Sequence, residues 1–142
     1  MDVLWDAIGE AVGGPAHAVL TRVSRAVREH FVDRAVMELE EPLDVAAVLE
    51  RSGLEARSLA PLATIRTHAW EGDGEPLAED LLQGHLALPW EGGTVEVVQV
   101  TWHQRFCEFQ RTFLIGDDDA SLGRFAVFAL ELANDVRGEV LV

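Results

Sequence analysis

Three consecutive aspartates, Asp117, Asp118 and Asp119, are the residues whose type and position most suggest a chemical role. They follow a predicted strand and precede a predicted helix, and carboxylates at a strand end can hold a hard cation such as Mg²⁺. A metal-dependent hydrolase that uses this loop is therefore one function compatible with the sequence. Alternatively, one aspartate caps the helix and the others favour its positive N-terminal dipole. Because adjacent carboxylates point in different directions, we favour the structural role and predict no metal site. If a metal ion is bound, Asp117, Asp118 and Asp119 are the candidate ligands.

His103 and Cys107 share one face of a predicted hairpin arm and could form half of a transition-metal site. A zinc site needs about four ligands, and the chain has no second cysteine. The remaining histidines are scattered along the sequence, at His17, His30, His68 and His85. As a nucleophile, Cys107 would need a base and electropositive surroundings. We predict that it packs in the core.

The 25 acidic residues show no spacing that marks an acid–base pair. The densest cluster, in segment 71–80, does not match the offsets of an EF-hand loop, and we interpret it as solvated. The chain also contains no lysine and no tyrosine, which excludes a Schiff-base lysine, a phosphate-loop lysine and a tyrosine acid. We therefore predict no catalytic residue, no cofactor and no enzymatic activity for this chain.

Three arginines, Arg22, Arg25 and Arg28, recur at three-residue spacing in a predicted helix, opposite its apolar arc. They form a basic stripe on an acidic chain. One interpretation is a solvated face paired with Glu29 and Asp33. The other is a docking face for an acidic surface, such as that of a neighbouring subunit.

Other predicted interaction residues are apolar. Trp90 lies in the turn-like segment 88–93 and is the best candidate for an exposed binding aromatic, whereas Trp5, Trp70 and Trp102 are expected to anchor the core. Val127 projects among polar residues of the last predicted helix, with Phe128 at the edge of that face. We expect this part of the helix to be covered on both sides or to meet a partner.

The net charge of −14 results from 25 acidic against 11 basic residues. Such a field repels nucleic acid and anionic lipid but favours contact with basic partners, so we predict a protein partner or a neighbouring subunit. No apolar run reaches the ~18 to 20 residues of a membrane span, and the N-terminus lacks the pattern of a signal peptide. A single cysteine fits a cytoplasmic protein.

Periodicity predicts the elements that must position these residues. Helices are expected at 2–12, from 15 to about 31, 44–49, 77–83 and 120–136, and strands at 35–39, 62–70, 85–88 and 140–142, with a hairpin at 94–102 and 105–115. The fold class is therefore α+β, with a mixed β-sheet, N-terminal helices, a β-hairpin and a C-terminal strand–helix–strand unit. That unit favours a parallel, right-handed crossover. Residues 1–142 form one domain.

The chain ends on an apolar, β-branched segment, Val140 to Val142, which we read as a strand after a helix that closes at Arg137 and Gly138. Natural domains usually end in a few polar residues. We therefore expect the sequence to be the N-terminal part of a longer protein.

The segment from Phe109 to Asp118, the helix around Phe125 and the end from Arg137 to Val142 together resemble part of a bacterial ATPase family. They are similar to the region just before the ATPase module in AAA-family proteins from high-GC bacteria such as myxobacteria. The resemblance implies a non-catalytic accessory domain for partner or substrate recognition or for subunit arrangement, with ATP and Mg²⁺ bound by the parent protein. Two alternatives remain: a stand-alone acidic, immunity-like binding protein, and the metal-dependent hydrolase.

Overall fold

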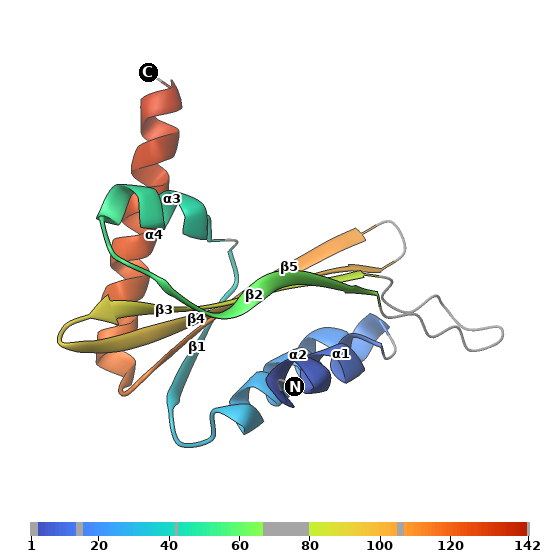
Figure 1. The fold of residues 1–142 in the computed structure, drawn as a ribbon. Helices are drawn as coiled ribbons and strands as arrows, with labels where there is room; N and C mark the ends of the chain where they lie inside the picture. The colour runs from blue at the N-terminus through green and yellow to red at the C-terminus, as the bar shows by residue number, and fades with distance from the viewer. Residues whose placement is uncertain (1–2, 14–15, 42, 67–79, 105–106, 142) are drawn as a thin grey trace.

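A computed structural model describes residues 3–13, 16–41, 43–66, 80–104 and 107–141 of the chain. Within them, four helices and five strands follow one another along the sequence (Figure 1). The elements are α1 (Val3–Val12), α2 (Ala16–His30), β1 (Ala35–Leu39), α3 (Val45–Ser52), β2 (Arg57–Arg66), β3 (Asp80–Trp90), β4 (Gly93–Gln104), β5 (Cys107–Gly116) and α4 (Asp119–Leu141).

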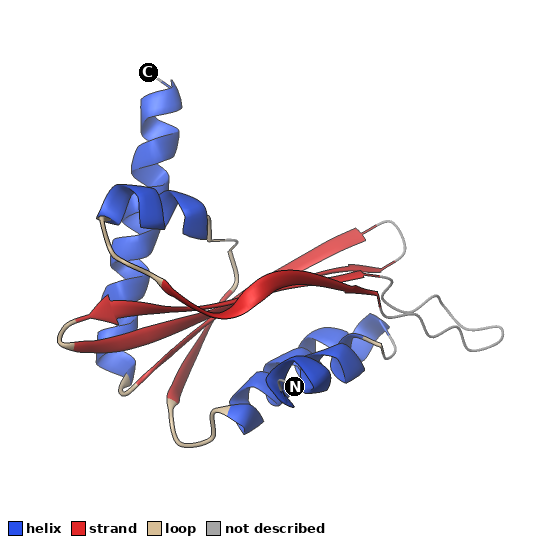
Figure 2. Cartoon of the chain, in the orientation of Figure 1, coloured by secondary structure: helices blue, strands red, loops and turns tan. Residues whose placement is uncertain are grey.

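The five strands form one sheet in the order β1-β5-β4-β3-β2, and every pair of neighbours is antiparallel. β3, β4 and β5 follow one another as a meander, while β1 and β2 occupy the two edges. Helices α1 and α2 lie on one face of the sheet, and α3 and α4 lie on the other (Figures 1 and 2). Because side chains alternate along a strand, β1, β3, β4 and β5 each contribute to two separate cores.

The first core lies between the sheet and the α1–α2 pair. Apolar residues of α2 recur four positions apart, which places them on one stripe toward the sheet. They meet the inward side chains of β4 at every second position. The fully buried members include Leu4, Ile8, Val19, Val23, Val27, Val98, Val100, Trp102, Phe113 and Ile115.

The second core uses the opposite parity of the same strands and is covered by α3 and α4. Its buried members include Val48, Leu88, Val95, Val97, Leu114, Leu122, Phe125 and Ala129. Asp44 caps α3, since its Oδ1 accepts the Ala47 N–H at 3.0 Å. Gly53 ends the helix with a φ of 72°, a left-handed value that glycine adopts without steric cost.

The α+β class, the N-terminal helices and the hairpin of β4 and β5 are confirmed. Trp5 and Trp102 are core residues as expected, while Trp70 lies outside the described residues. A helix at 77–83 is wrong over its described part, because β3 already begins at Asp80. Two adjacent leucines, Leu81 and Leu82, are compatible with a helix or a strand, and pairing with β4 favours the strand.

The predicted strand at 140–142 is wrong over residues 140 and 141. α4 continues through Gly138 to Leu141, and Val142 lies outside the described residues. A glycine inside a helix costs only about 1 kcal/mol, and adding residues to an existing helix is far easier than starting a strand. The predicted C-terminal strand–helix–strand unit is therefore wrong over its described part, because α4 follows β5 and continues to Leu141. The described strands form a sheet without a parallel pair of neighbours. Figure 1 shows α4 extending beyond the sheet toward the C-terminus.

Candidate functional site

Asp118 serves as the N-cap of α4. Its Oδ1 accepts the Ser121 N–H at 2.7 Å, and its carbonyl accepts the Leu122 N–H at 3.2 Å. Asp117 and Asp119 are exposed beside it. The capping role predicted for one aspartate of this run is therefore confirmed.

Replacing Asp118 with alanine is expected to lower the free energy of unfolding by about 1 kcal/mol, because the Ser121 N–H loses its acceptor. Asp119→Ala is the matched control, since Asp119 is exposed in the first turn of the same helix and is expected to cost only a few tenths of a kcal/mol. Urea unfolding followed by circular dichroism measures both. Equal losses for the two variants would contradict the capping role.

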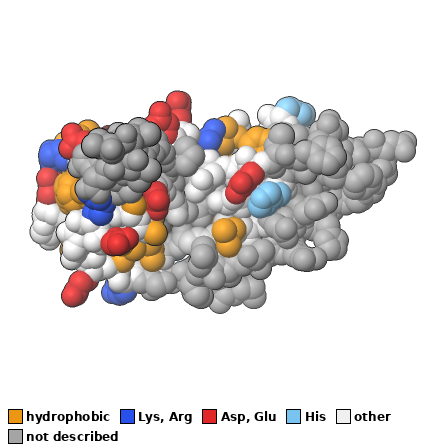
Figure 3. Space-filling view, turned by 90° about the horizontal axis from the view of Figure 1, so that it is seen from above, with side chains coloured by type: hydrophobic (Ala, Val, Ile, Leu, Met, Phe, Trp, Pro, Cys, Tyr) orange, Lys and Arg blue, Asp and Glu red, His pale blue; other side chains and the backbone are white. Residues whose placement is uncertain are grey.

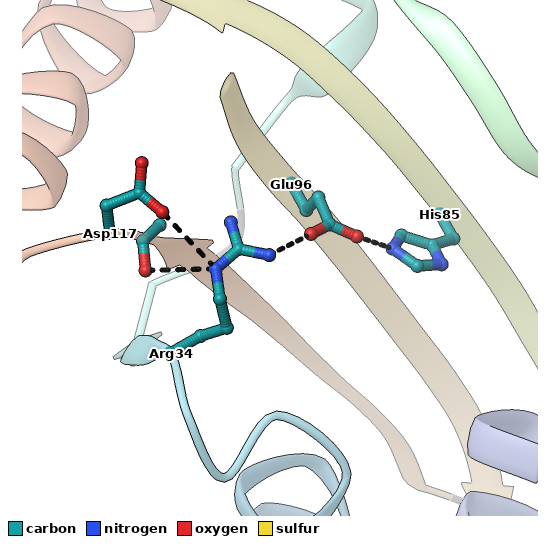
Figure 4. A network of polar contacts seen from close by, with 5 residues as sticks. Arg34, His85, Glu96 and Asp117 are labelled. Atoms are coloured by element: carbon teal, nitrogen blue, oxygen red, sulfur yellow. Dashed lines mark hydrogen bonds and ion pairs between the residues drawn. The ribbon is translucent and has the colours of Figure 1, made fainter. Parts of the chain in front are cut away.

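A chain of polar contacts connects the aspartate loop to the interior (Figure 4). Asp117 Oδ1 lies 3.6 Å from Arg34 Nε, and Arg34 Nη1 donates to Glu96 Oε2 at 2.8 Å. The other carboxylate oxygen, Glu96 Oε1, lies 2.9 Å from His85 Nε2. Arg34 Nε also donates to the Gly116 carbonyl at 3.4 Å. This Arg34–Glu96–His85 network joins the residue before β1 to strands β3 and β4.

The surroundings of His85 show that the network is part of the first core. The His85 ring makes edge contacts with the rings of Trp5 and Phe31, at centroid distances of 6.4 and 6.1 Å. Only 9% of its side chain is exposed, and only 16% of the Glu96 side chain. Buried polar groups need partners, and here the carboxylate supplies an acceptor to both the imidazole and the guanidinium.

The same geometry bears on the hydrolase alternative. The Arg34 guanidinium and the Glu96 carboxylate lie between Asp117 and His85. The side chains of Asp117 and His85 therefore do not converge on one position. A guanidinium beside the carboxylates also repels a cation. Across the described part of the chain, no group of three or more His, Cys, Asp or Glu side chains is placed to hold a metal ion.

The side chains of the arginine stripe point in different directions. Arg22 donates from Nε and Nη2 to the Ala11 carbonyl, at 3.2 and 3.0 Å, and so caps the C-terminal end of α1. Arg28 turns toward β1, where its Nη1 lies 3.4 Å from the Val36 carbonyl. Arg25 lines the same groove as Arg22.

Arg22 and Arg25 line a groove between α1 and α2 with a volume of about 590 Å³. Small apolar side chains and charged groups of both signs surround it. The lining consists of Val3, Ala7, Glu10, Ala11, Arg22, Arg25, Ala26, Glu29 and His30. Its volume lies within the ~300 to 1,000 Å³ typical of binding pockets. This α1–α2 groove is the candidate functional site.

Trp90 is not the exposed aromatic that its turn suggested. Its ring packs against Phe125 and Phe128, at centroid distances of 5.3 and 5.0 Å, and its Nε1 donates to the Ser121 carbonyl at 3.2 Å. Phe128 is likewise half-buried, so both residues hold α4 against the β3–β4 turn. Val127 is 57% exposed, and its contact with a partner stays a prediction.

The β3–β4 turn is joined to α4 by a two-pronged ion pair. Arg124 donates to both oxygens of Glu91, each at 2.7 Å. The hydrogen bond from Arg124 lowers the pKa of the Glu91 carboxyl below its ordinary value. Glu91 and Gly92 have φ values of 48° and 79°, which are typical of a two-residue hairpin turn. Figure 3 shows acidic and basic side chains interspersed around α4.

The remaining predicted ligands do not assemble in the described structure. His103 is exposed, with Nε2 3.9 Å from Glu108 Oε1, while the Cys107 side chain and the acidic segment 71–79 lie outside the described residues. Sequence reasoning missed Glu96 and Arg34. A usable signal existed, because Glu96 has the same parity as Val98 and Val100, and a charge on an apolar strand face requires a buried partner.

Comparison with protein-family models, curated protein sequences and solved structures gives no match to this chain. Among the described helices, none combines the length and the apolar character that a membrane crossing requires. The resemblance to the AAA-family region stays a prediction from the sequence.

Proposed function

We propose that this chain is a non-catalytic protein-recognition domain that binds an amphipathic helix of a partner in the α1–α2 groove. The observation that carries the proposal is the groove itself, about 590 Å³ in volume, with alanines in its lining and charges around them. Val3 and Ala7 recur one turn apart on α1, where Val3 is 70% exposed, and Ala26 lies on α2, so an incoming helix meets a short apolar strip. Helix-in-groove recognition uses this arrangement of an apolar strip with a polar rim.

The charged rim supplies orientation and selectivity. Arg22 and Arg25 offer donors to partner carboxylates, whereas Glu10 and Glu29 offer acceptors to partner lysines or arginines. Arg22 is already engaged by the Ala11 carbonyl, which leaves Arg25 as the arginine whose replacement disturbs the fold least.

An accessory domain of an AAA-family ATPase is one setting for such a module, and a stand-alone acidic binding protein is the other. Both assign the groove the same role. The non-catalytic part of the proposal is tested by titrating the purified chain with ATP and Mg²⁺. Measurable turnover or micromolar nucleotide affinity would overturn it.

The groove is tested by placing a photo-crosslinking amino acid at position 25 and, as a control, at exposed Arg57 on the edge strand β2, in the native host. Crosslinks to one protein are expected from position 25 only. With that protein purified, Arg25→Glu is expected to weaken binding about tenfold, the size of effect found for interfacial arginines, and Arg57→Glu to leave it unchanged. Equal crosslinking from both positions, or equal affinity of both variants, would contradict the groove.

A further inference from the structure

β5 is longer than the strand that covers its outer edge. β1 pairs with residues 112–116 of β5 and ends where Leu39 faces Thr112. Residues 107–111 pair with β4 on one side, and no described strand lies on the other. An open strand edge is a template for pairing with another chain.

The direction of the backbone groups along this edge follows from β1. The Val36 carbonyl accepts from Arg28 and therefore points away from β5. Val36 faces Ile115, and backbone groups alternate along a strand, so the even-numbered residues of β5 turn toward β1. Glu108 and Gln110 therefore present their backbone groups to the open side.

One of these groups is already engaged by a side chain. Arg111 Nη1 donates to the Gln110 carbonyl at 2.9 Å, and Arg111 Nε lies 3.6 Å from Glu38 Oε1. The guanidinium therefore occupies the position that the N–H of an added strand would take. Covering an edge in this way limits unspecific pairing, and a specific partner must displace the side chain.

The side chains beside the open edge define what an added strand would carry. Phe109 is 41% exposed, and its ring stacks on the buried Trp102 at a centroid distance of 5.6 Å. Glu108 points to the opposite face of the sheet and is exposed. Just past the end of β1, Glu40 and Glu41 are exposed as well. Cross-strand neighbours share a face, so an apolar residue suits the position beside Phe109 and a basic residue the position beside Glu108.

We propose that residues 107–111 of β5 bind an extended segment of a partner protein, with alternating apolar and basic residues, as an added strand. Backbone pairing with Glu108 and Gln110 supplies affinity, and the alternation supplies selectivity. The net charge of −14 favours the approach of a basic segment. This surface is separate from the α1–α2 groove and does not depend on it.

The proposal is tested on the full chain with a capped octapeptide of alternating valine and lysine, and with a valine–glutamate octapeptide as the control. Calorimetry is expected to show at least tenfold weaker binding of the control, and hydrogen exchange to show protection of the Glu108 and Gln110 amides by the lysine peptide. Equal affinities, or no protection of those amides, would overturn the proposal.

Two substitutions with opposite expected effects sharpen the test. Gln110→Pro removes an N–H that faces the open side, so the sheet keeps its bonds to β4 while the lysine peptide no longer binds. Arg111→Ala frees the Gln110 carbonyl and removes a repelling charge, so affinity is expected to rise about fivefold. Binding to Gln110→Pro at full strength, or weaker binding to Arg111→Ala, would contradict the open edge.

Circular dichroism melting identifies any variant that fails to fold. If Gln110→Pro unfolds, Glu108→Lys takes its place, because Glu108 is exposed and its reversal is expected to weaken lysine-peptide binding several-fold. Unchanged binding to Glu108→Lys would overturn the basic selectivity. Arg25→Glu is expected to bind the lysine peptide normally, which separates this edge from the α1–α2 groove.

Discussion

Phe125→Ala is expected to lower the free energy of unfolding by about 3 to 5 kcal/mol, the range found for buried phenylalanines. Phe125 is fully buried at the centre of the second core, and Trp90 meets its ring edge-on at 5.3 Å. The substitution removes this aromatic contact and leaves a cavity between α4 and the sheet. Urea unfolding monitored by tryptophan fluorescence and by circular dichroism measures the loss.

Val127→Ala is the matched control, since Val127 lies two residues further along α4 and is 57% exposed. Its effect is expected to stay within about 0.5 kcal/mol. Phe125→Leu should lose less than Phe125→Ala, because leucine refills part of the cavity. A Phe125→Ala variant as stable as Val127→Ala would show that α4 does not pack on the sheet as described.

Glu96→Ala is expected to lower the free energy of unfolding by about 2 to 3 kcal/mol. This is less than the loss from breaking a fully buried ion pair, because Arg34 is partly exposed. The change removes the acceptor of both His85 and Arg34. It leaves the imidazole between Trp5 and Phe31 with no carboxylate, and an unpaired buried polar group carries a desolvation cost. Equilibrium unfolding at neutral pH measures this loss.

Glu96→Gln retains an acceptor oxygen and the shape of the side chain, so we expect it to lose only part of that stability. Glu108→Ala is the control on the neighbouring strand, because the Glu108 side chain is 63% exposed and its contact with His103 is long, at 3.9 Å. Its effect should remain within about 0.5 kcal/mol. Equal losses of unfolding free energy for Glu96→Ala and Glu108→Ala would contradict a stabilising role of the network in the core.

The elements that could be predicted are those whose pattern allows only one solution. In β4, Val98, Val100 and Trp102 alternate with smaller or polar residues, and that period of two specifies a strand with one buried face. In α2, Val19, Val23 and Val27 recur one turn apart, which specifies a helix. The capping of α4 by Asp118 was also within reach, because a capping side chain lies next to the helix that it serves.

The mispredicted segments have local patterns compatible with two structures. Leu81 and Leu82 suit a helix or a strand, and pairing with Trp102 and Thr101 on β4 decides for the strand. Val140 and Leu141 favour a strand by composition, but the helix that starts at Asp119 continues through them. Trp90 looked exposed because it lies in a turn, and only the position of α4 covers it.

The sequence by itself determined the α+β class, the apolar faces of α2 and β4, the acidic net charge and the lack of a phosphate-loop lysine. Each depends on composition or on neighbours within one or two turns, which periodicity reports directly. Only the tertiary structure decided that Arg34, Glu96 and His85 form one network. It also decided that Arg22 and Arg28 bind different elements, and that β1 pairs with only part of β5. These features join residues as far as 82 positions apart, as for Arg34 and Gly116, and strand register alone brings such residues together.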